Sequence, residues 1–119
     1  MIPATLELGG KSANIVFDDA DMTQAIDGAC KGILFNQGQV CCAGSRLFVQ
    51  EGIFDEFLKH LKATFEAVKI GDPTDPTTQL GAQIYKAQQD KVLNYVKLGV
   101  EEGCQLITGG GKIHRKRLR

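Results

Sequence analysis

The spacing of apolar residues changes repeatedly along the 119-residue chain, and these changes restrict its fold more than any other feature. Four short apolar runs have the length and flanking turn residues of β-strands. These runs cover residues 5–8, 14–17, 46–50 and 105–108. Apolar residues at helical spacing cover residues 21–35, 53–68 and 83–102. Strands interspersed with helices are typical of α/β domains, so we predict an α/β layer with at least partly parallel pairing.

Local signals set several boundaries of these elements. Asp21 and Gln24 have the spacing of a capping box and predict where the first helix begins. Residues 71–76, Gly-Asp-Pro-Thr-Asp-Pro, are dense in turn formers and predict a loop after the second helix. Gly103 is a suitable residue to end the third helix in the left-handed conformation.

Composition limits the protein classes that fit this chain. Hydrophobic residues make up 43% and charged residues 24%, as in a globular domain with a buried core, and the length allows one small domain. The formal charge is zero, but five of the 14 basic residues lie within residues 112–119. Residues 1–111 hold nine basic and 14 acidic residues, so we expect neither nucleic acid nor a membrane as the partner of this acidic body.

The cysteines predict a reducing environment. Cys41 and Cys42 are adjacent, and Cys30 and Cys104 stand far from each other in sequence. Adjacent cysteines rarely form a disulfide, because the bond needs α-carbons about 5.5 Å apart. The chain also shows no apolar run long enough for a membrane span, and residues 1–4 lack the basic flank and apolar run typical of a signal peptide. We therefore expect free thiols and a cytoplasmic location.

Several common chemistries lack their motifs. Gly9-Gly10-Lys11-Ser12 has Thr5 where a phosphate-binding P-loop needs its first glycine. No Gly-x-Gly-x-x-Gly or Gly-x-Ser-x-Gly is present, which argues against a complete dinucleotide-binding unit and against a hydrolase nucleophile elbow. His60 and His114 have no partner at zinc-ligand spacing, so we predict no metal site and expect His60 to be a solvated helix residue.

The cysteine pair lies in a glycine-rich polar segment, residues 35–46, between a predicted helix and a predicted strand. Backbone amides in such a loop can activate an exposed thiol, and its small residues leave room for a substrate carbonyl. Composition alone equally allows Cys41 and Cys42 to be small buried residues, because free cysteine is among the most buried residue types.

Glu7 is a carboxylate within an otherwise apolar run that two glycines follow. Alternation places Leu6 and Leu8 on one face of the predicted strand and Glu7 on the other, which is typical of an outward-facing residue. The alternative is a buried, functional carboxylate that acts as a general base.

Together, these two segments resemble the active-site signatures of the aldehyde dehydrogenase superfamily. The first is Leu6-Glu7-Leu8-Gly9-Gly10-Lys11-Ser12, and the second, Gly38-Gln39-Val40-Cys41-Cys42-Ala43-Gly44, places Cys41 34 residues after Glu7. The resemblance continues through residues 14–21 and 71–73 to about Gly110. It implies part of an α/β catalytic domain that has three layers and a mainly parallel sheet.

The resemblance also implies a role for each site residue. Cys41 corresponds to the nucleophile that forms a thiohemiacetal and then a thioester, and its backbone amide to an oxyanion donor. Glu7 corresponds to the base that activates water, which favours the acid-forming branch over members that transfer the acyl group to coenzyme A. Leu8 and Gly9 resemble residues near the nicotinamide of NAD or NADP. The implied substrate is a small-molecule aldehyde, and the implied assembly is a homo-oligomer.

Family members are several times longer than this chain. We therefore expect residues 1–111 to be a partial catalytic domain and residues 112–119 to be a basic, disordered tail outside it, as a truncated or frame-shifted reading frame would produce. The isolated chain is then expected to lack full activity, because the cofactor domain is not within it. The alternatives are cofactor-independent esterase activity alone, and a non-catalytic fragment that self-associates or binds nucleic acid through its tail.

Overall fold

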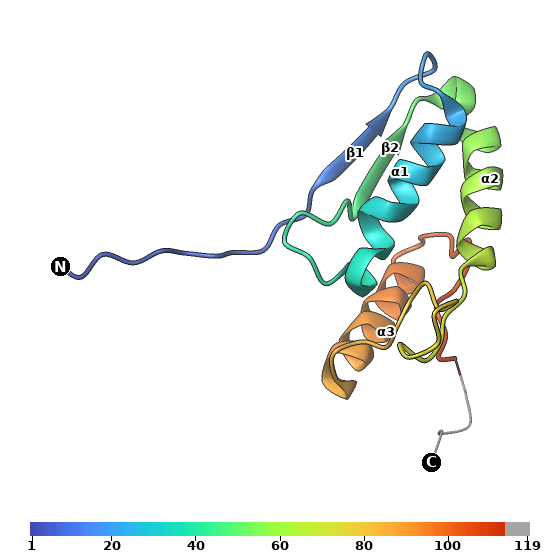
Figure 1. Cartoon of the computed structure of the whole chain (residues 1–119). Helices are drawn as coiled ribbons and strands as arrows, with labels where there is room; N and C mark the ends of the chain where they lie inside the picture. The colour runs from blue at the N-terminus through green and yellow to red at the C-terminus, as the bar shows by residue number, and fades with distance from the viewer. Residues whose placement is uncertain (114–119) are drawn as a thin grey trace. The chain divides into compact units, whose positions relative to one another are not determined.

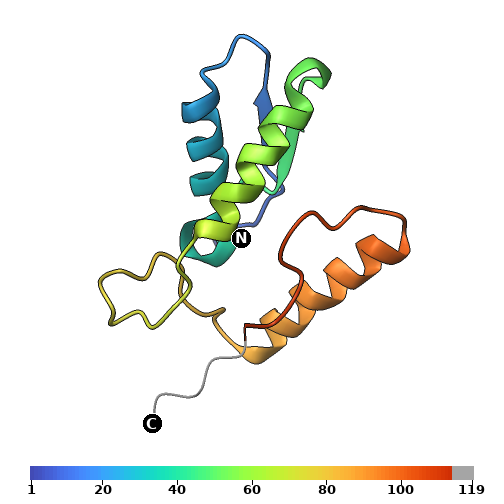
Figure 2. The same ribbon diagram turned by 90° about the vertical axis from the view of Figure 1, so that its right-hand side faces the viewer.

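A parallel pair of strands organises the first of two compact units in the computed structural model, which describes residues 1–113. In this unit, residues 1–82, β1 (Ala13–Val16) pairs with β2 (Arg46–Val49), with Ala13 opposite Arg46 and Val16 opposite Val49. α1 (Met22–Leu34) makes the crossover between the strands, and α2 (Phe54–Ala67) follows β2. Figures 1 and 2 show both helices on the same face of the sheet.

The core of this unit lies between the sheet and the helix layer. Alternation turns Val16 of β1 toward the helices, and the 3.6-residue period of α1 and α2 turns one apolar stripe of each helix toward the sheet. The buried cluster consists of Val16, Ile26, Ala29, Cys30, Phe57 and Leu61. The parallel pairing and the α/β class are therefore as predicted, and the described residues provide two of the three expected layers.

The second face of the sheet is apolar but exposed. Ile15 and Phe48 are opposite each other in the strand register, and 63% and 51% of their surfaces are accessible. Phe17 extends this exposed apolar face, and the Arg46 guanidinium lies 5.7 Å from the centre of the Phe48 ring. Within residues 1–113, no element of this unit buries these side chains.

Capping explains where α1 begins. The Asp21 carboxylate accepts a hydrogen bond from the Gln24 backbone N–H at 2.9 Å, which satisfies one of the free donors of the first turn. This confirms the helix start that the Asp21–Gln24 spacing predicts. The hydrogen bond to Gln24 also lowers the pKa of Asp21 below its ordinary value.

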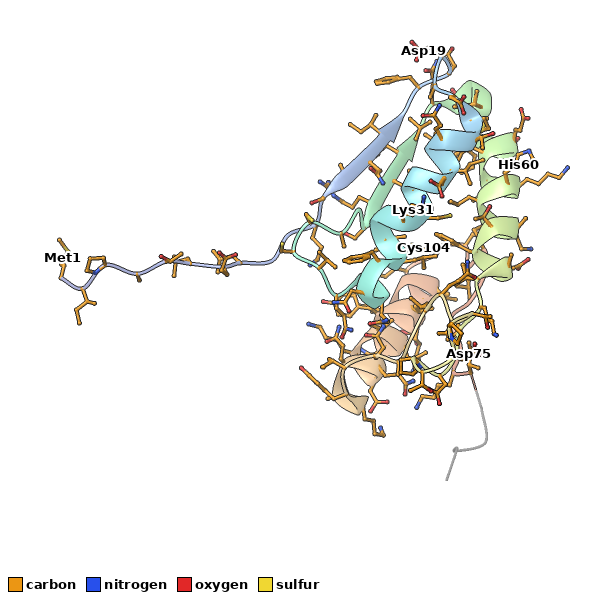
Figure 3. The ribbon with its side chains drawn as sticks, in the orientation of Figure 1. Met1, Asp19, Lys31, His60, Asp75 and Cys104 are labelled. Atoms are coloured by element: carbon orange, nitrogen blue, oxygen red, sulfur yellow. The ribbon has the colours of Figure 1, made fainter. Side chains whose placement is uncertain are left out.

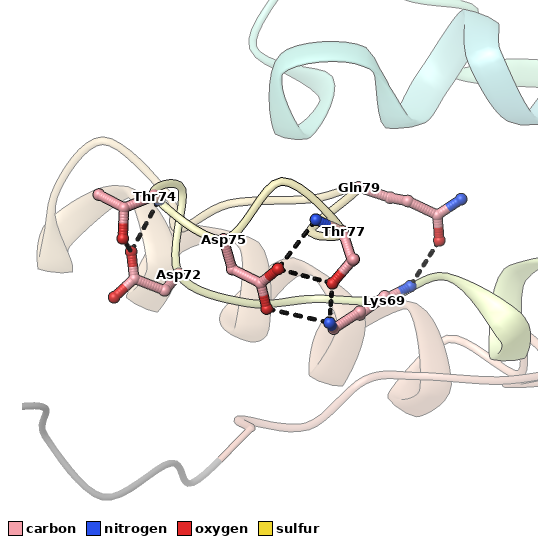
Figure 4. A network of polar contacts seen from close by, with 6 residues as sticks. All are labelled: Lys69, Asp72, Thr74, Asp75, Thr77 and Gln79. Carbon is pink, nitrogen blue, oxygen red and sulfur yellow. Dashed lines mark hydrogen bonds and ion pairs between the residues drawn. The ribbon is translucent and has the colours of Figure 1, made fainter.

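The loop after α2 is held by its own polar side chains, as Figure 4 shows. Its sequence repeats Asp-Pro-Thr, and each aspartate accepts hydrogen bonds from the backbone N–H and hydroxyl of the threonine two residues later. The Lys69 ammonium joins the second repeat through Asp75, at 3.0 Å, and through Thr77. The bonds from Thr74 lower the pKa of Asp72. The loop predicted over residues 71–76 is confirmed.

The second unit begins at residue 83 and contains α3 (Lys86–Glu101). Gly103 ends the helix with φ +94°, as expected, in a Schellman motif: its N–H donates to Val100 O, and the Cys104 N–H donates to Gly99 O. Asp90 pairs with Lys86 and with Lys112, and these hydrogen bonds and charges lower the pKa of its carboxyl.

Two predicted strands are wrong. Residues 5–8 belong to an exposed N-terminal arm without secondary structure, and residues 105–108 form no strand either. A strand needs a hydrogen-bonded partner, and the described residues offer none to these runs. The basic tail expected over residues 112–119 lies outside the described residues from position 114 onward.

We predict that Phe57→Ala removes the largest single packing contribution to the first unit. The ring is 1% exposed, so its truncation leaves a cavity that costs about 3–5 kcal/mol. Urea denaturation followed by circular dichroism measures this loss. Phe54→Ala, in the same helix but at a position 45% exposed, is the control and is expected to cost far less. Equal losses would contradict the assignment of Phe57 to the core.

We also predict that Asp21→Asn removes part of the acid sensitivity of α1. The pKa of Asp21 in the folded chain lies below its unfolded value of 3.8. The charged cap therefore contributes its full stabilisation to the folded state above pH 3.8, and this contribution is lost as the pH falls through the folded pKa. Asparagine caps equally well without titrating. Urea midpoints of the two proteins should agree at pH 7 and diverge below about pH 4, with wild type the less stable. A constant difference across this range would contradict the prediction.

Candidate active site

Both segments that the sequence singled out lead directly into strands. Glu7 lies six residues before β1, and Cys41 lies five residues before β2. Because the strands are parallel and Ala13 is opposite Arg46, both segments reach the same edge of the sheet, where the strands begin. Arg46 fastens them together: its Nε donates to Lys11 O at 2.8 Å and its backbone N–H to Ser12 O at 3.2 Å.

The two segments enclose an open cavity of about 460 Å³ within the first unit. Its lining from the first segment is Glu7, Leu8, Gly9, Gly10 and Lys11. Its lining from the second segment is Gly38, Gln39, Val40, Cys41, Ala43 and Ser45. The structure therefore brings together all four site residues that the sequence predicted: Glu7, Leu8, Gly9 and Cys41.

Gly10 lets the two segments approach each other closely. A β-carbon at this position would lie 3.0 Å from the Cys41 carbonyl oxygen, so a side chain here would push the cysteine loop away. Gly10 of this glycine pair thus serves close packing between backbones, whereas Gly9 has no neighbour within 4 Å of its β-carbon position. The pair does not serve phosphate binding of the P-loop type, because Gly9-Gly10-Lys11-Ser12 leads into β1 and not into a helix.

A left-handed turn connects α1 to the cysteines. In η1 (Phe35–Gly38), Asn36, Gln37 and Gly38 have φ values of 47°, 58° and 74°. This conformation costs a residue with a side chain about 1–2 kcal/mol. The Asn36 side chain offsets part of this cost, because its Nδ2 donates to Gln39 O at 3.1 Å. Strained backbone of this kind is concentrated at functional sites.

Cys41 and Cys42 occupy the two central positions of the next turn. The Ala43 N–H donates to Val40 O at 3.1 Å and closes the turn, and the buried Ala43 holds it against the unit. Both cysteine side chains are exposed. The structure therefore decides between the two alternatives left by composition: Cys41 and Cys42 are not small core residues.

The other cysteines behave differently. All four are free thiols, as the sequence predicted, and Cys104 is also exposed. Cys30 lies in the core on α1, where burial, with a smaller contribution from the charge of Asp27, raises the pKa of its thiol. Glu7 is exposed as well, so it is neither the buried carboxylate nor, in the absence of a strand at residues 5–8, an outward strand residue.

Asn14 is a supporting residue that sequence reasoning missed. A β-carbon at Gly44 would lie 2.8 Å from Asn14 Nδ2, and one at Gly32 would lie 3.2 Å from it, so the amide fills the space beside both glycines. The Gly44 N–H also donates to Gly32 O at 2.8 Å, which anchors the end of the cysteine loop to α1. A polar residue on the inner face of β1 and a glycine within α1 were the available signals.

The remaining candidates stay outside the cavity lining. His60 lies on the outer side of α2, with its Nε2 3.9 Å from Glu56, which confirms a solvated helix residue (Figure 3). His114 is not among the described residues. No cluster of three or more metal-ligating side chains occurs between residues 1 and 113. Over the same residues, no helix has the length and apolar character needed to cross a bilayer.

Comparison with known proteins identifies the family. The model of the aldehyde dehydrogenase family matches residues 1–118. The chain belongs to the aldehyde dehydrogenase family. A betaine aldehyde dehydrogenase from Sinorhizobium fredii (strain NBRC 101917 / NGR234) is 57% identical over 107 residues, which are 90% of this chain and 22% of the relative. The chain thus spans about a fifth of the length of this aldehyde dehydrogenase.

Solved aldehyde dehydrogenase structures confirm the fold. A betaine aldehyde dehydrogenase double mutant from Staphylococcus aureus, in complex with NAD+ and with a BME-modified cysteine, matches with a TM-score of 0.90 and 40% identity. The match covers 92% of this chain and 22% of that chain. For a putative aldehyde dehydrogenase from Burkholderia cenocepacia, the TM-score is 0.89, the identity 48% and the coverage 91% and 22%.

We predict that Gly38→Ala disturbs the left-handed turn that leads to Cys41. An alanine at φ +74° is strained, and its β-carbon would lie 3.2 Å from Ile33 O, so the cost should be about 1–2 kcal/mol. Urea denaturation provides the measurement. Gly52→Ala, which has no neighbour within 4 Å, is the control and should change stability by less than about 0.5 kcal/mol. A Gly38→Ala protein as stable as wild type would argue against this turn.

Proposed function

We propose that this chain supplies the nucleophile and the general base of an NAD-dependent aldehyde dehydrogenase that produces a carboxylic acid. One observation carries the proposal: Cys41 and Glu7, from segments 34 residues apart, line the same cavity. Membership of the aldehyde dehydrogenase family supports the reaction class.

Cys41 acts as the nucleophile in this proposal. Its thiol is exposed to the cavity, and the glycines and alanine around it leave room for a substrate carbonyl. Attack by the thiolate on an aldehyde forms a thiohemiacetal, and loss of hydride converts this adduct into a thioester. The Cys41 backbone N–H is one donor for the developing oxyanion.

In this proposal, Leu8 and Gly9 form the side of the cavity that receives the nicotinamide ring. Gly9 has no atom within 4 Å of the place where its β-carbon would stand, so this wall is open to a flat ligand. NAD, when bound, accepts the hydride of the oxidation step. NAD+ is present in the S. aureus relative, which makes NAD the first cofactor to test.

Glu7 completes the reaction as the base. It lines the same cavity from the segment that contacts the Cys41 carbonyl through Gly10. Its carboxylate takes a proton from water, and the water attacks the thioester and releases the carboxylic acid and the Cys41 thiolate. A carboxylate at this place favours hydrolysis over transfer to coenzyme A.

The relatives suggest a substrate to test, and the free thiols suggest a cellular compartment. The name of the S. fredii relative makes betaine aldehyde the first aldehyde to test. Four free thiols support a reducing compartment such as the cytoplasm. Because the chain spans 22% of that relative, we propose that the complete reaction requires segments beyond residues 1–119.

We predict that the 119-residue chain hydrolyses an activated ester through Cys41 but produces no steady-state NADH from an aldehyde. Ester hydrolysis needs no hydride acceptor, whereas oxidation does. Cys41→Ser should lower the ester rate at least tenfold, roughly, because the thiolate is the stronger nucleophile. Release of a chromophoric alcohol measures the first reaction, and absorbance of NADH measures the second.

The controls separate the two roles. Cys42→Ser, also exposed and next to Cys41, should keep the ester rate near that of wild type. Glu7→Gln should preserve acylation and slow deacylation, so that a burst precedes a slower steady state. Equal ester rates for wild type and Cys41→Ser would refute the proposed nucleophile, and NADH production that depends on Cys41 would refute the inactivity of the isolated chain.

Self-association is a second candidate function, and the exposed apolar face of the sheet favours it. Ile15, Phe17 and Phe48 are large and apolar, and all three are exposed. Removal of this surface from water, at about 25 cal/mol per Å², favours pairing with a second copy. This supports the homo-oligomer that the family resemblance implies.

We predict that Phe48→Asp shifts the purified chain toward the monomer. The substitution places a charge at the centre of the exposed apolar face and penalises its burial between two copies. Light scattering coupled to gel filtration measures the molecular mass. Phe54→Asp, also at an exposed phenylalanine but on α2, is the control. A wild-type chain that is monodisperse and monomeric would refute self-association.

A further inference from the structure

Asn14 is the polar residue of β1, and the proposed reaction gives it no role. It points to the same side of the strand as the buried Val16, because residues two apart in a strand share a face. The side chain is half-buried at the margin of the core. Polar atoms in such a place cost free energy unless they have suitable partners, so the reason for an amide here must lie in its surroundings.

Two glycines leave the space that this amide fills. The three atoms nearest to a β-carbon at Gly44 would all belong to Asn14: Nδ2 at 2.8 Å, Cγ at 3.3 Å and Oδ1 at 3.8 Å. A β-carbon at Gly32, on α1, would have Asn14 Nδ2 as its nearest neighbour, at 3.2 Å. Neither glycine has a positive φ, so what a side chain would meet at either position is the amide and not a strained backbone.

Strand, helix and loop meet at this point. Asn14 lies on β1, into which the Glu7 segment leads. Gly44 ends the loop that carries Cys41, three residues earlier. The Gly44 N–H donates to Gly32 O at 2.8 Å and fastens the loop end to α1. We call Asn14, Gly32 and Gly44 the amide joint, and its central side chain is the spacer between the loop end and β1.

We propose that Asn14 is a positioning residue for the cysteine loop. Its amide fixes the distance between the loop end and β1, and thereby the place of the Cys41 thiol relative to the Glu7 carboxylate. Asn14 is not among the residues that line their cavity, so it acts through Gly44 and not by contact with the substrate. The inference rests on the proposed function of Cys41 and Glu7.

The two halves of the proposed reaction depend on this placement to different degrees. Acylation needs only the exposed Cys41 thiolate and the ester. Deacylation needs the thioester, a water molecule and the Glu7 carboxylate in line at the same moment. A misplacement of about 1 Å can slow an aligned step about a hundredfold. A loop end that has lost its spacer should therefore impair deacylation more than acylation.

Burst kinetics of the 119-residue chain with a chromophoric ester test this difference, because the burst measures acylation and the steady state measures deacylation. Asn14→Ala removes the spacer and is expected to slow the steady state about tenfold or more, with a burst rate close to that of wild type. The ratio of the two rates counts only molecules that react, so loss of folded protein does not change it. An unchanged ratio would overturn the proposal.

Val16→Ala is the matched control for stability. Val16 lies on the same side of β1 but belongs to the buried cluster and not to the amide joint. Its truncation should lower the urea midpoint at least as far as Asn14→Ala does, yet preserve the ratio of burst to steady-state rates. If Val16→Ala changes this ratio as much as Asn14→Ala does, the effect is one of general stability and the positioning role is wrong.

Two glycines of α1 test the contact without any measurement of activity. Gly32 would meet the amide, whereas Gly28, one helical turn earlier, has no neighbour within 4 Å of its β-carbon position. Alanine is the better helix former, so Gly28→Ala should raise the urea midpoint in wild type and in Asn14→Ala alike. Gly32→Ala should raise it only when Asn14→Ala has removed the amide. Equal effects of Gly32→Ala in the two backgrounds would contradict the amide joint.

The combination of Asn14→Ala with Gly44→Ala provides the final test. Gly44→Ala displaces the loop end by contact with the amide, so it should also slow deacylation, and Asn14→Ala should then restore part of the rate. Losses that simply add would refute this contact. If Cys41→Ser leaves ester hydrolysis unchanged, the proposed function fails, and the urea midpoints still decide the amide joint. If hydrolysis depends on Cys41 but Asn14→Ala keeps the wild-type ratio of rates, the positioning role alone fails.

Discussion

The parallel hydrogen bonding between β1 and β2 determines where the residues of the candidate site lie. Parallel strands start at the same edge of a sheet, and each of the two motif segments ends where its strand starts. One ladder therefore brings Glu7 and Cys41 to the same cavity, although α1 and its flanking loops separate them in sequence. Ligands of open α/β sheets usually bind at the carboxyl ends of the strands, whereas this candidate site lies at the opposite edge.

Close approach between backbones is the second requirement of the site. Gly10 lies against the Cys41 carbonyl, Gly44 and Gly32 lie against the Asn14 amide, and Gly38 continues a left-handed turn. At each of these positions a side chain would either clash or be strained. Hydrogen bonds at both ends of the cysteine loop hold Asn36 and Gln37 in their strained conformation. At one end the Asn36 side chain donates to Gln39 O, and at the other the Gly44 N–H donates to Gly32 O.

The sequence predicted the parts of the fold that depend on local or periodic signals. The apolar stripe of α2 and the cap at Asp21 specify their helices without reference to distant residues. The strands predicted from the apolar runs at 5–8 and 105–108 are wrong, because a strand also needs a partner strand, which periodicity does not reveal. The exposure of Glu7 and Cys41 likewise depends on residues distant in sequence, so the sequence pattern could not decide it. The role of Asn14 depends on two glycines from other elements, and the sequence pattern does not show that these three residues meet.

The strand register has a geometric consequence for any chain of this design. Each residue of a strand advances the backbone by about 3.3 Å, and pairing can slip only by two residues without exchanging the faces of the sheet. A slip that keeps Val16 in the core would therefore move one motif past the other by about 6.6 Å, more than the length of a hydrogen bond. Even the smallest register shift that the sheet permits would therefore move the Glu7 carboxylate and the Cys41 thiol too far apart to face the same molecule.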